Sequence, residues 1–276
     1  MTSARVALLH QGHRCSFCFG GSASQVASAA ATAEYASALA RPQRNRLLGA
    51  LPRAELTALL PHLELVQLEH QDTFFEPSGP IDFVFFPETA VVSFVSTFED
   101  GGTVEVGTAG CEGMVGLPVF LGESISTVRW FTQIPGTASR MDAATFARLA
   151  AAPGTLHRIM LRYTQTVLTQ VSQTAACNAA HLVEQRCARW LLMTHDRVEG
   201  DEFPLTHEFL AFMLNVRRAG VTLAMRARQD AGVVQCTRGH VKVVDRAGLE
   251  RASCECYRVV STHFARLFEL NAPHPA

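Results

Sequence analysis

The sequence predicts an α+β protein with three parts in chain order: a β-roll, a long helix, and a pair of short helices followed by a β-hairpin. Three observations predict it. Short runs of alternating apolar residues, separated by turn signals, fill residues 66–141. A helical periodicity then continues unbroken over residues 155–182. Residues 204–231 have the pattern of two helices around a tight turn, and a strand–turn–strand pattern follows directly.

Length and charge limit the possible classes of protein. The 276 residues, 48% hydrophobic and 18% charged, suffice for about two globular domains. A formal net charge of −1 excludes a polycation that binds nucleic acid along its whole length. Residues 182–270 hold 13 Lys and Arg against 11 Asp and Glu, a net charge of +2, so any basic surface there must be local.

The sequence shows no apolar run of the kind that targets a protein to or across a membrane. No apolar run approaches the roughly 18 residues of a membrane span. The chain start offers only residues 6–9 as an apolar core, which is shorter than the ~7–15 residues of a signal peptide. We therefore expect a cytoplasmic protein with no membrane partner, whose eight cysteines are reduced thiols.

The N-terminal part predicts a tail and then a first domain. Residues 20–40 are rich in Ala, Ser and Gly, so residues 1–43 are expected to be a disordered tail. Leucines at helical spacing over residues 45–65, interrupted by Pro52 and Pro61, predict one or two short amphipathic helices. The β-roll completes a first domain over residues 44–152.

The long helix carries a repeated pattern that predicts a contact between helices. Residues at steps of three and four form one face: Met160, Tyr163, Val167, Val171, Thr174 and Asn178. This spacing predicts a seam for the same helix of a second subunit over residues 153–182. The alternative is a helix buried within its own subunit. A shorter helix is predicted over residues 183–195, beneath the two-helix motif.

The first helix of the motif has clear signals. Thr206 is a favourable N-cap, and Leu210, Met213 and Leu214 form one apolar face. Asn215 tolerates the left-handed conformation that a tight turn needs. Val216 is predicted to be buried in the turn. The second helix is expected to bury Val221, Leu223, Ala224 and Ala227.

Basic and polar residues remain for the start and outer side of the second helix: Arg217, Arg218, Thr222, Arg226 and Arg228. A helix that begins with two arginines and presents small side chains outward can enter a DNA major groove. The alternative is a helical hairpin with a solvated arginine face. The hairpin over residues 233–244 has a basic tip at Arg238, and this order predicts a winged helix-turn-helix over residues 183–270. The predicted DNA contacts are Thr206, Arg217, Arg218, Thr222, Arg226 and Arg238.

The layout of β-roll, long helix and winged helix resembles the Crp/Fnr family of transcription regulators over about residues 45–270. The motifs that carry the resemblance are Asp100-Gly101, Val104-Glu105-Val106-Gly107, Glu112-Gly113-Met114-Val115-Gly116-Leu117-Pro118, Leu205-Thr206-His207-Glu208-Phe209-Leu210-Ala211 and Val216-Arg217-Arg218. The resemblance implies a cyclic-nucleotide-binding-type jelly roll, a dimerisation helix, and a homodimer that binds a two-fold-symmetric site on double-stranded DNA. It also implies contact with RNA polymerase if the protein is an activator.

Two positions depart from the family at the DNA-reading helix. Arg218 falls where members commonly have a base-reading arginine. Ala219 stands where Glu is frequent, and Leu223 stands where some members have a further Arg. The resemblance therefore implies a half-site sequence different from the usual one.

The sensor half departs further. Members that bind cyclic AMP have Gly-Glu at a short helix and Arg-Ser/Thr-Ala about ten residues later; here these positions are Gly116-Leu117 and Ser126-Thr127-Val128. Arg129 is adjacent, but strand alternation points it the other way. We expect no cyclic AMP binding. A pocket at Gly116, Leu117, Ser126, Thr127 and Arg129 would hold an unknown small-molecule effector or none.

The cysteines and histidines of the chain allow three other interpretations. Cys15-x-x-Cys18 resembles part of the ligand set of iron–sulfur relatives, with Cys111 as a β-roll ligand, but a cubane needs four thiolates and no third cysteine follows nearby. A thiol redox sensor on the same DNA-binding half is the alternative, with Cys111, Cys177 and Cys187 as its candidates. A metal enzyme built on the β-roll is excluded because residues 71–156 contain no histidine.

One cysteine pair near the C-terminus remains. Cys254 and Cys256 are predicted to lie on a single C-terminal helix that begins near Arg246. Two positions apart on a helix, their thiols would point in different directions and serve poorly as ligands of one metal. The sequence thus predicts no enzyme, no metal and no cofactor.

Overall fold

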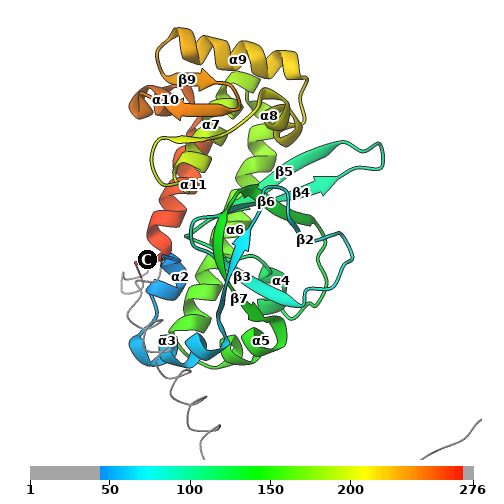
Figure 1. Cartoon of the computed structure of the whole chain (residues 1–276), viewed down its shortest axis with the longest axis vertical. Coiled ribbons are helices and arrows are strands. Elements are labelled where there is room, and N and C mark those ends of the chain that lie inside the picture. Colours follow the sequence, from blue (N-terminus) through cyan, green and yellow to red (C-terminus); the bar gives the residue numbers. More distant parts are fainter. Residues whose placement is uncertain (1–43, 270–276) are drawn as a thin grey trace, which may run out of the picture. The chain divides into compact units, whose positions relative to one another are not determined.

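The computed structural model describes residues 44–269 and confirms the α+β architecture of β-sheets, long helix and helix-turn-helix with a small sheet (Figure 1). The predicted tail over residues 1–43, with Cys15 and Cys18, lies outside the described residues.

Short helices open the described chain, broken where the prolines predicted. They are α2 (Arg46–Gly49), α3 (Arg53–Leu59) and the 3-10 helix η1 (Leu60–His62). Asn45 is the N-cap of α2, because its Oδ1 accepts from the N–H groups of Leu47 and Leu48. Its Nδ2 donates to the carbonyls of Pro87 and Gly113, which fixes this segment against the β-roll.

Seven antiparallel strands form the β-roll: β1 (Glu64–Leu68), β2 (Thr73–Phe75), β3 (Phe83–Pro87), β4 (Val91–Thr97), β5 (Thr103–Ala109), β6 (Arg129–Ile134) and β7 (Gly136–Asp142). The strand order is β1-β7-β3 in one sheet and β2-β6-β4-β5 in the other. Each predicted run contains a strand. Strand β2 was not predicted, because three residues are too few to show an alternation of apolar and polar side chains.

Aromatic and aliphatic side chains fill the interior of the roll. Phe94 and Trp130 stack with ring centroids 4.4 Å apart, and they share one core cluster with Val84 and Phe86 of the other sheet. The short helix α4 (Leu117–Phe120) adds Leu117 to the same cluster. Helix α5 (Ala143–Ala151), capped by Asp142, closes the domain.

The long helix α6 (Thr155–Ala180) forms as predicted, but part of its predicted seam is wrong. Met160 and Tyr163 are fully buried in the chain's own core, and the Tyr163 hydroxyl donates to the Met114 carbonyl at 3.0 Å. Thr174 is also buried and accepts from Arg189. These three residues therefore pack within their own subunit, as expected from the alternative prediction of a helix buried in its own chain.

A different stripe of α6 is exposed. Its members follow each other at steps of four and three: Leu161, Gln165, Leu168, Ser172, Ala175 and Ala179. Leu161 and Leu168 are 53% and 56% exposed. This is a heptad pattern with small and polar residues between two leucines.

The C-terminal part begins with α7 (Val183–His195), which has the predicted bounds. It is followed by β8 (Glu202–Pro204), α8 (His207–Leu214), α9 (Arg218–Asp230), β9 (Val234–Thr237) and β10 (His240–Val243). Trp190 and Leu191 of α7 share a core cluster with Leu210 of α8 and Val221 of α9, so α7 underlies the two-helix motif. Strand β8 was not predicted; it pairs with β10 and gives the order β8-β10-β9.

The single C-terminal helix of the prediction is wrong, because the chain forms two. Helix α10 (Arg246–Ala252) ends before Ser253, and α11 (Glu255–Leu267) begins after Cys254. Helix α11 packs along α6, as Figure 1 shows.

Candidate nucleic-acid interface

The turn between α8 and α9 has the local geometry that its residues predict. Thr206 Oγ1 accepts from the Phe209 N–H at 3.1 Å and caps α8. Asn215 adopts the left-handed conformation, with φ of 48° and ψ of 55°, which turns the chain sharply after α8. Val216 is partly buried, where full burial was predicted.

Helix α9 buries a narrower face than predicted. Val221, Ala224 and Met225 are buried, whereas Leu223 is 68% exposed and Ala227 is exposed. Leu223 follows Val221 by two positions, about 200° around a helix of 3.6 residues per turn, so the two cannot share a side. The prediction for Leu223 was wrong for this reason, and Ala227, also predicted to be buried, is exposed.

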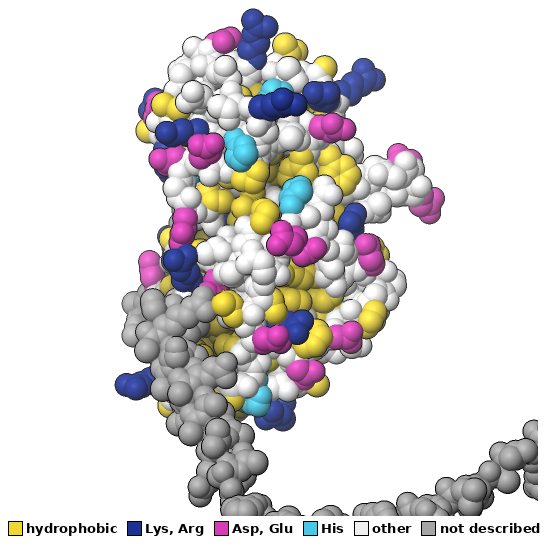
Figure 2. Space-filling model, viewed as in Figure 1, with side chains coloured by type: hydrophobic (Ala, Val, Ile, Leu, Met, Phe, Trp, Pro, Cys, Tyr) yellow, Lys and Arg dark blue, Asp and Glu magenta, His cyan; other side chains and the backbone are white. Residues whose placement is uncertain are grey.

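The outer surface of α9 is basic. Arg217 is the N-cap, Arg218 is the first helical residue, and both are exposed together with Thr222 and Arg226. Figure 2 shows Lys and Arg side chains gathered over α9 and the adjacent hairpin. Arg228, predicted to face outward, is partly buried.

Two further predicted contacts flank this helix. Thr206, at the start of α8, is exposed. Arg238 is exposed in the turn between β9 and β10, beside Gly239, whose φ of 79° permits the tight reversal. Thr206, Arg238 and the exposed arginines of α9 thus belong to one helix–turn–helix–hairpin unit.

The positive charge at the start of α9 comes from its arginines and its helix N-terminus, without a contribution from His207. The His207 ring lies 3.2 Å from the Thr222 hydroxyl. Burial and the Arg218 charge lower the pKa of His207 below its ordinary value, so this histidine stays neutral at physiological pH. The free N–H groups and dipole of the helix N-terminus add positive potential beside the two arginines. Such a surface can bind phosphates and base edges.

The residues predicted to form an effector pocket are not all brought together. Leu117 is buried in the core, and Gly116 has a φ of 96° close to Val84. Ser126 is buried and its hydroxyl donates to the Val128 carbonyl at 2.7 Å, while Thr127 is exposed.

Arg129 is held by residues outside that predicted pocket. Its Nη2 donates to the Thr73 hydroxyl at 3.0 Å, and its Nε lies 3.4 Å from the Glu76 carboxylate. It lines a cavity of about 400 Å³ that Thr206 of the helix-turn-helix also lines, together with His70, Gln71, Phe131, Glu208, Phe209 and Phe212.

The C-terminal part of the chain is similar to a known family of DNA-binding domains. Residues 185–252 match the model of the Crp-like helix-turn-helix domain. The chain therefore carries the DNA-binding domain of Crp-type transcription regulators. Among curated proteins no match is found.

Solved structures share the fold of the chain. FixK2 from Bradyrhizobium japonicum superposes with a TM-score of 0.61 at 13% identity, over 70% of this chain and 98% of its own. A putative Crp/Fnr regulator from Eubacterium rectale gives 0.57 at 15% identity, over 76% and 98%. The c-di-GMP-responsive regulator CLP of Xanthomonas campestris gives 0.54 at 16% identity, over 70% and 99%.

The class of the protein follows from the same match. A Crp-like helix-turn-helix places it among transcription regulators and not among enzymes. In the part of the chain that the structure describes, no helix combines the length and apolarity needed to cross a bilayer.

The three cysteines predicted as candidates for redox sensing, Cys111, Cys177 and Cys187, lie in different environments. Burial raises the pKa of Cys187 to about 12, and burial together with the Glu112 charge raises the pKa of Cys111. Both changes disfavour the reactive thiolate. Cys177 lies elsewhere, at the end of α6, beside Cys254.

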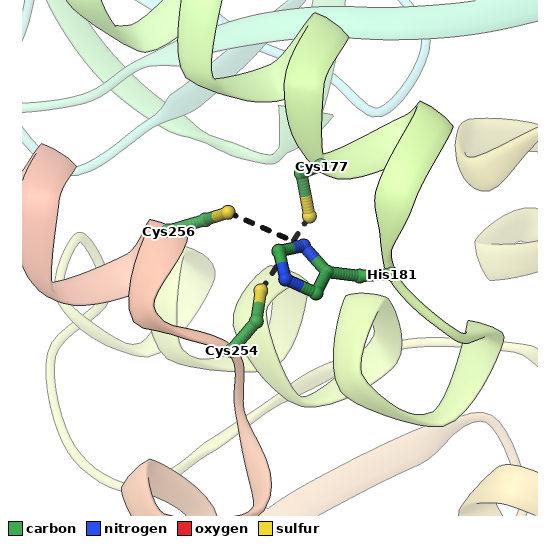
Figure 3. Close-up of side chains that lie close together, drawn as sticks. All are labelled: Cys177, His181, Cys254 and Cys256. Atoms are coloured by element: carbon green, nitrogen blue, oxygen red, sulfur yellow. Dashed lines mark hydrogen bonds between the residues drawn. The ribbon is translucent and has the colours of Figure 1, made fainter.

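The prediction that Cys254 and Cys256 point apart was wrong. Cys254 is the N-cap of α11, outside the helix, so the spacing rule for two helical residues does not apply to it. Both thiols converge on Cys177 and His181 of the α6 terminus (Figure 3). The sequence analysis did not predict this cluster of four residues.

Proposed function

We propose that the protein acts as a homodimer that binds a two-fold-symmetric DNA site, with α9 of each subunit in one major groove. The observation that carries this proposal is the exposed basic start of α9, where Arg217 and Arg218 stand at the helix N-terminus. A recognition helix contacts base edges with the residues of its first turns. The match to a Crp-like helix-turn-helix supports the same orientation.

Within this interface Arg218 reads a base and Arg217 holds a phosphate. Arg218 is the first residue inside α9 and falls where Crp/Fnr members commonly have a base-reading arginine, whereas Arg217 is the N-cap outside the helix. A bidentate Arg–guanine pair discriminates between bases by about 1–3 kcal/mol. Thr222, Arg226, Thr206 and Arg238 add contacts along the helix and from the wing.

The second subunit is bound through the exposed stripe of α6. Leu161 and Leu168 lie two helical turns apart on one side, with Ala175 further along the same side. The heptad spacing of these residues suits a parallel pair of helices. Two copies of α9 are then related by the two-fold axis that a palindromic site requires.

The sensor domain works without cyclic AMP. Leu117 occupies the position where cyclic-AMP-binding members have the Glu that binds the ribose, and stacked Phe94 and Trp130 lie in the interior of the roll. Ser126 occupies the position of the arginine that pairs with the cyclic phosphate, while Arg129 is engaged with Thr73 and Glu76.

The test is selection of bound DNA from random sequence, followed by titration of Arg218→Ala and Arg217→Ala on the selected site. Arg218→Ala is expected to weaken binding and to relax preference at one base pair in each half-site. Arg217→Ala is expected to weaken all sequences alike and to reduce the salt slope by about one unit.

Arg258 is a matched control, since it is an exposed arginine on α11. Arg258→Ala should bind as the wild type does. Undiminished affinity and base preference in Arg218→Ala would show that α9 does not lie in the groove as proposed.

A further inference from the structure

Three cysteines and one histidine meet at the junction of α6 and α11 (Figure 3). Their ligand atoms all lie within 4.8 Å of one another. Cys177, Cys254 and Cys256 are 0%, 4% and 0% exposed, and His181 is partly buried. No part of the proposed DNA contact uses these side chains.

The local structure explains why residues far apart in sequence converge here. Cys177 lies in the last turn of α6, and His181 is its C-cap four positions later, so both face the same side of the helix end. Cys254 caps α11 and Cys256 lies in the first turn of that helix. The packing of α11 along α6 brings the two pairs together.

We propose that Cys177, His181, Cys254 and Cys256 form a Cys3His site for a single Zn²⁺ ion. Around one tetrahedral zinc, with Zn–S of about 2.3 Å and Zn–N of about 2.0–2.1 Å, neighbouring ligand atoms stand about 3.5–3.8 Å apart. Here Cys177 Sγ lies 3.5 Å from Cys254 Sγ, and Cys256 Sγ lies 3.4 Å from His181 Nδ1.

The spacing and chemistry of the ligands select the ion. A cubane bonds each of its four ligands to a different iron, so its ligands must stand wider apart than those of a single ion. Thiolates are soft ligands and exclude Mg²⁺ and Ca²⁺, which prefer oxygen. Three thiolates and one imidazole are a common donor set of closed structural zinc sites.

Groups around the four ligands are arranged as a metal site requires. The second ring nitrogen of His181, Nε2, lies 3.4 Å from the Glu255 carboxylate, which orients the ring and leaves Nδ1 toward the thiols. The Gln173 amide donates to Cys256 Sγ at 3.1 Å. Such a bond stabilises a thiolate over a neutral thiol.

The site connects two helices of the chain and lies next to the start of a third. Its ligands come from the end of α6 and the start of α11, and α7 begins two residues after His181. Bound zinc would fix the connection between the long helix and the helix that underlies the helix-turn-helix.

The experiment measures zinc in the full chain purified under reducing conditions, by elemental analysis and native mass spectrometry. One zinc per chain is expected. Replacement by Co²⁺ should give the thiolate-to-cobalt charge-transfer and strong visible bands of a tetrahedral site. Cys254→Ser should lose the zinc, whereas the double variant Cys15→Ser/Cys18→Ser and the variant Cys236→Ser should keep it.

Glu255→Gln tests the site without removing a ligand, at a residue whose side chain is 63% exposed. Zinc affinity, measured by competition with a chromogenic chelator, should fall on the order of 10–100-fold. The matched control is Glu184→Gln, an exposed glutamate on α7.

The proposal is overturned if the wild type neither contains zinc nor develops the cobalt bands. It is equally overturned if zinc stays in Cys254→Ser, if the protein carries iron–sulfur absorption, or if Glu255→Gln and Glu184→Gln bind zinc equally. None of these measurements depends on DNA binding, so the site can fail or stand independently of the proposed function.

Discussion

Replacing Glu105 with Gln should stabilise the protein at neutral and alkaline pH. Glu105 lies on β5 with only 7% of its surface exposed, and the Ser93 hydroxyl donates to its carboxylate at 2.8 Å. Burial raises the pKa of Glu105 to about 7; the Ser93 hydrogen bond and the charges of Arg189 and Arg197 offset only part of the burial effect.

The magnitude follows from the displacement of that pKa from its ordinary value of 4.5 to about 7. Each pKa unit corresponds to about 1.4 kcal/mol, so ionised Glu105 costs the folded state roughly 3 kcal/mol. The folded pKa is the higher one. The cost is therefore absent below about pH 4.5, grows as the unfolded chain releases its proton, and is complete above about pH 7.

The assay is urea unfolding of the wild type and Glu105→Gln from pH 4.5 to 8.5, at one fixed protein concentration because association contributes to stability. Gln keeps an oxygen that accepts from Ser93 but carries no charge. The variant's stability relative to the wild type should rise by roughly 3 kcal/mol between pH 4.5 and 7.5 and then level off. Other titrating groups cancel in this difference. A difference independent of pH, or one that falls as pH rises, would refute the burial argument.

Two further predictions concern assembly and the sensor domain. Leu168→Glu should convert the proposed dimer to a monomer at micromolar concentration in light scattering, because it places a charge in the exposed stripe of α6. The control Leu121→Glu, at an equally exposed leucine of the β-roll domain, should remain dimeric. A monomeric wild type would contradict the prediction. Calorimetric titration with cyclic AMP and cyclic GMP should detect no binding at micromolar concentrations, because Phe94 and Trp130 fill the roll interior; micromolar affinity for either nucleotide would contradict that account.

The sequence predicts elements well where local signals agree with packing. The predicted bounds of α7 match, because its apolar residues, a preceding break and a polar loop coincide. The turn at Asn215 was equally predictable, since few residues other than Gly and Asn accept its backbone conformation.

The sequence predictions were wrong where the same helical spacing of apolar residues is compatible with two different packing partners. Met160 and Tyr163 have helical spacing, but spacing cannot tell a helix of another subunit from strands of the same chain. The exposed stripe was hidden because Gln165 and Ser172 interrupt its leucines.

The cysteine cluster was hidden for another reason. The helix break at Ser253 turns Cys254 into an N-cap and gives it a new direction. Its partner Cys177 is distant in sequence, and only the packing of α11 on α6 brings them together. A local pattern contains neither piece of information.

The pairing of β8 with β10 has a consequence for how movement reaches the DNA-reading helix. Glu202 pairs with Lys242, so the chain enters and leaves the segment that contains α8 and α9 at neighbouring strands. Helix α7 leads into the first of these strands, and α10 follows the second. A displacement passed on by either helix therefore acts on the same strand pair. We expect it to rotate α8, α9 and the wing together as a rigid body, with the angle between the two helices preserved.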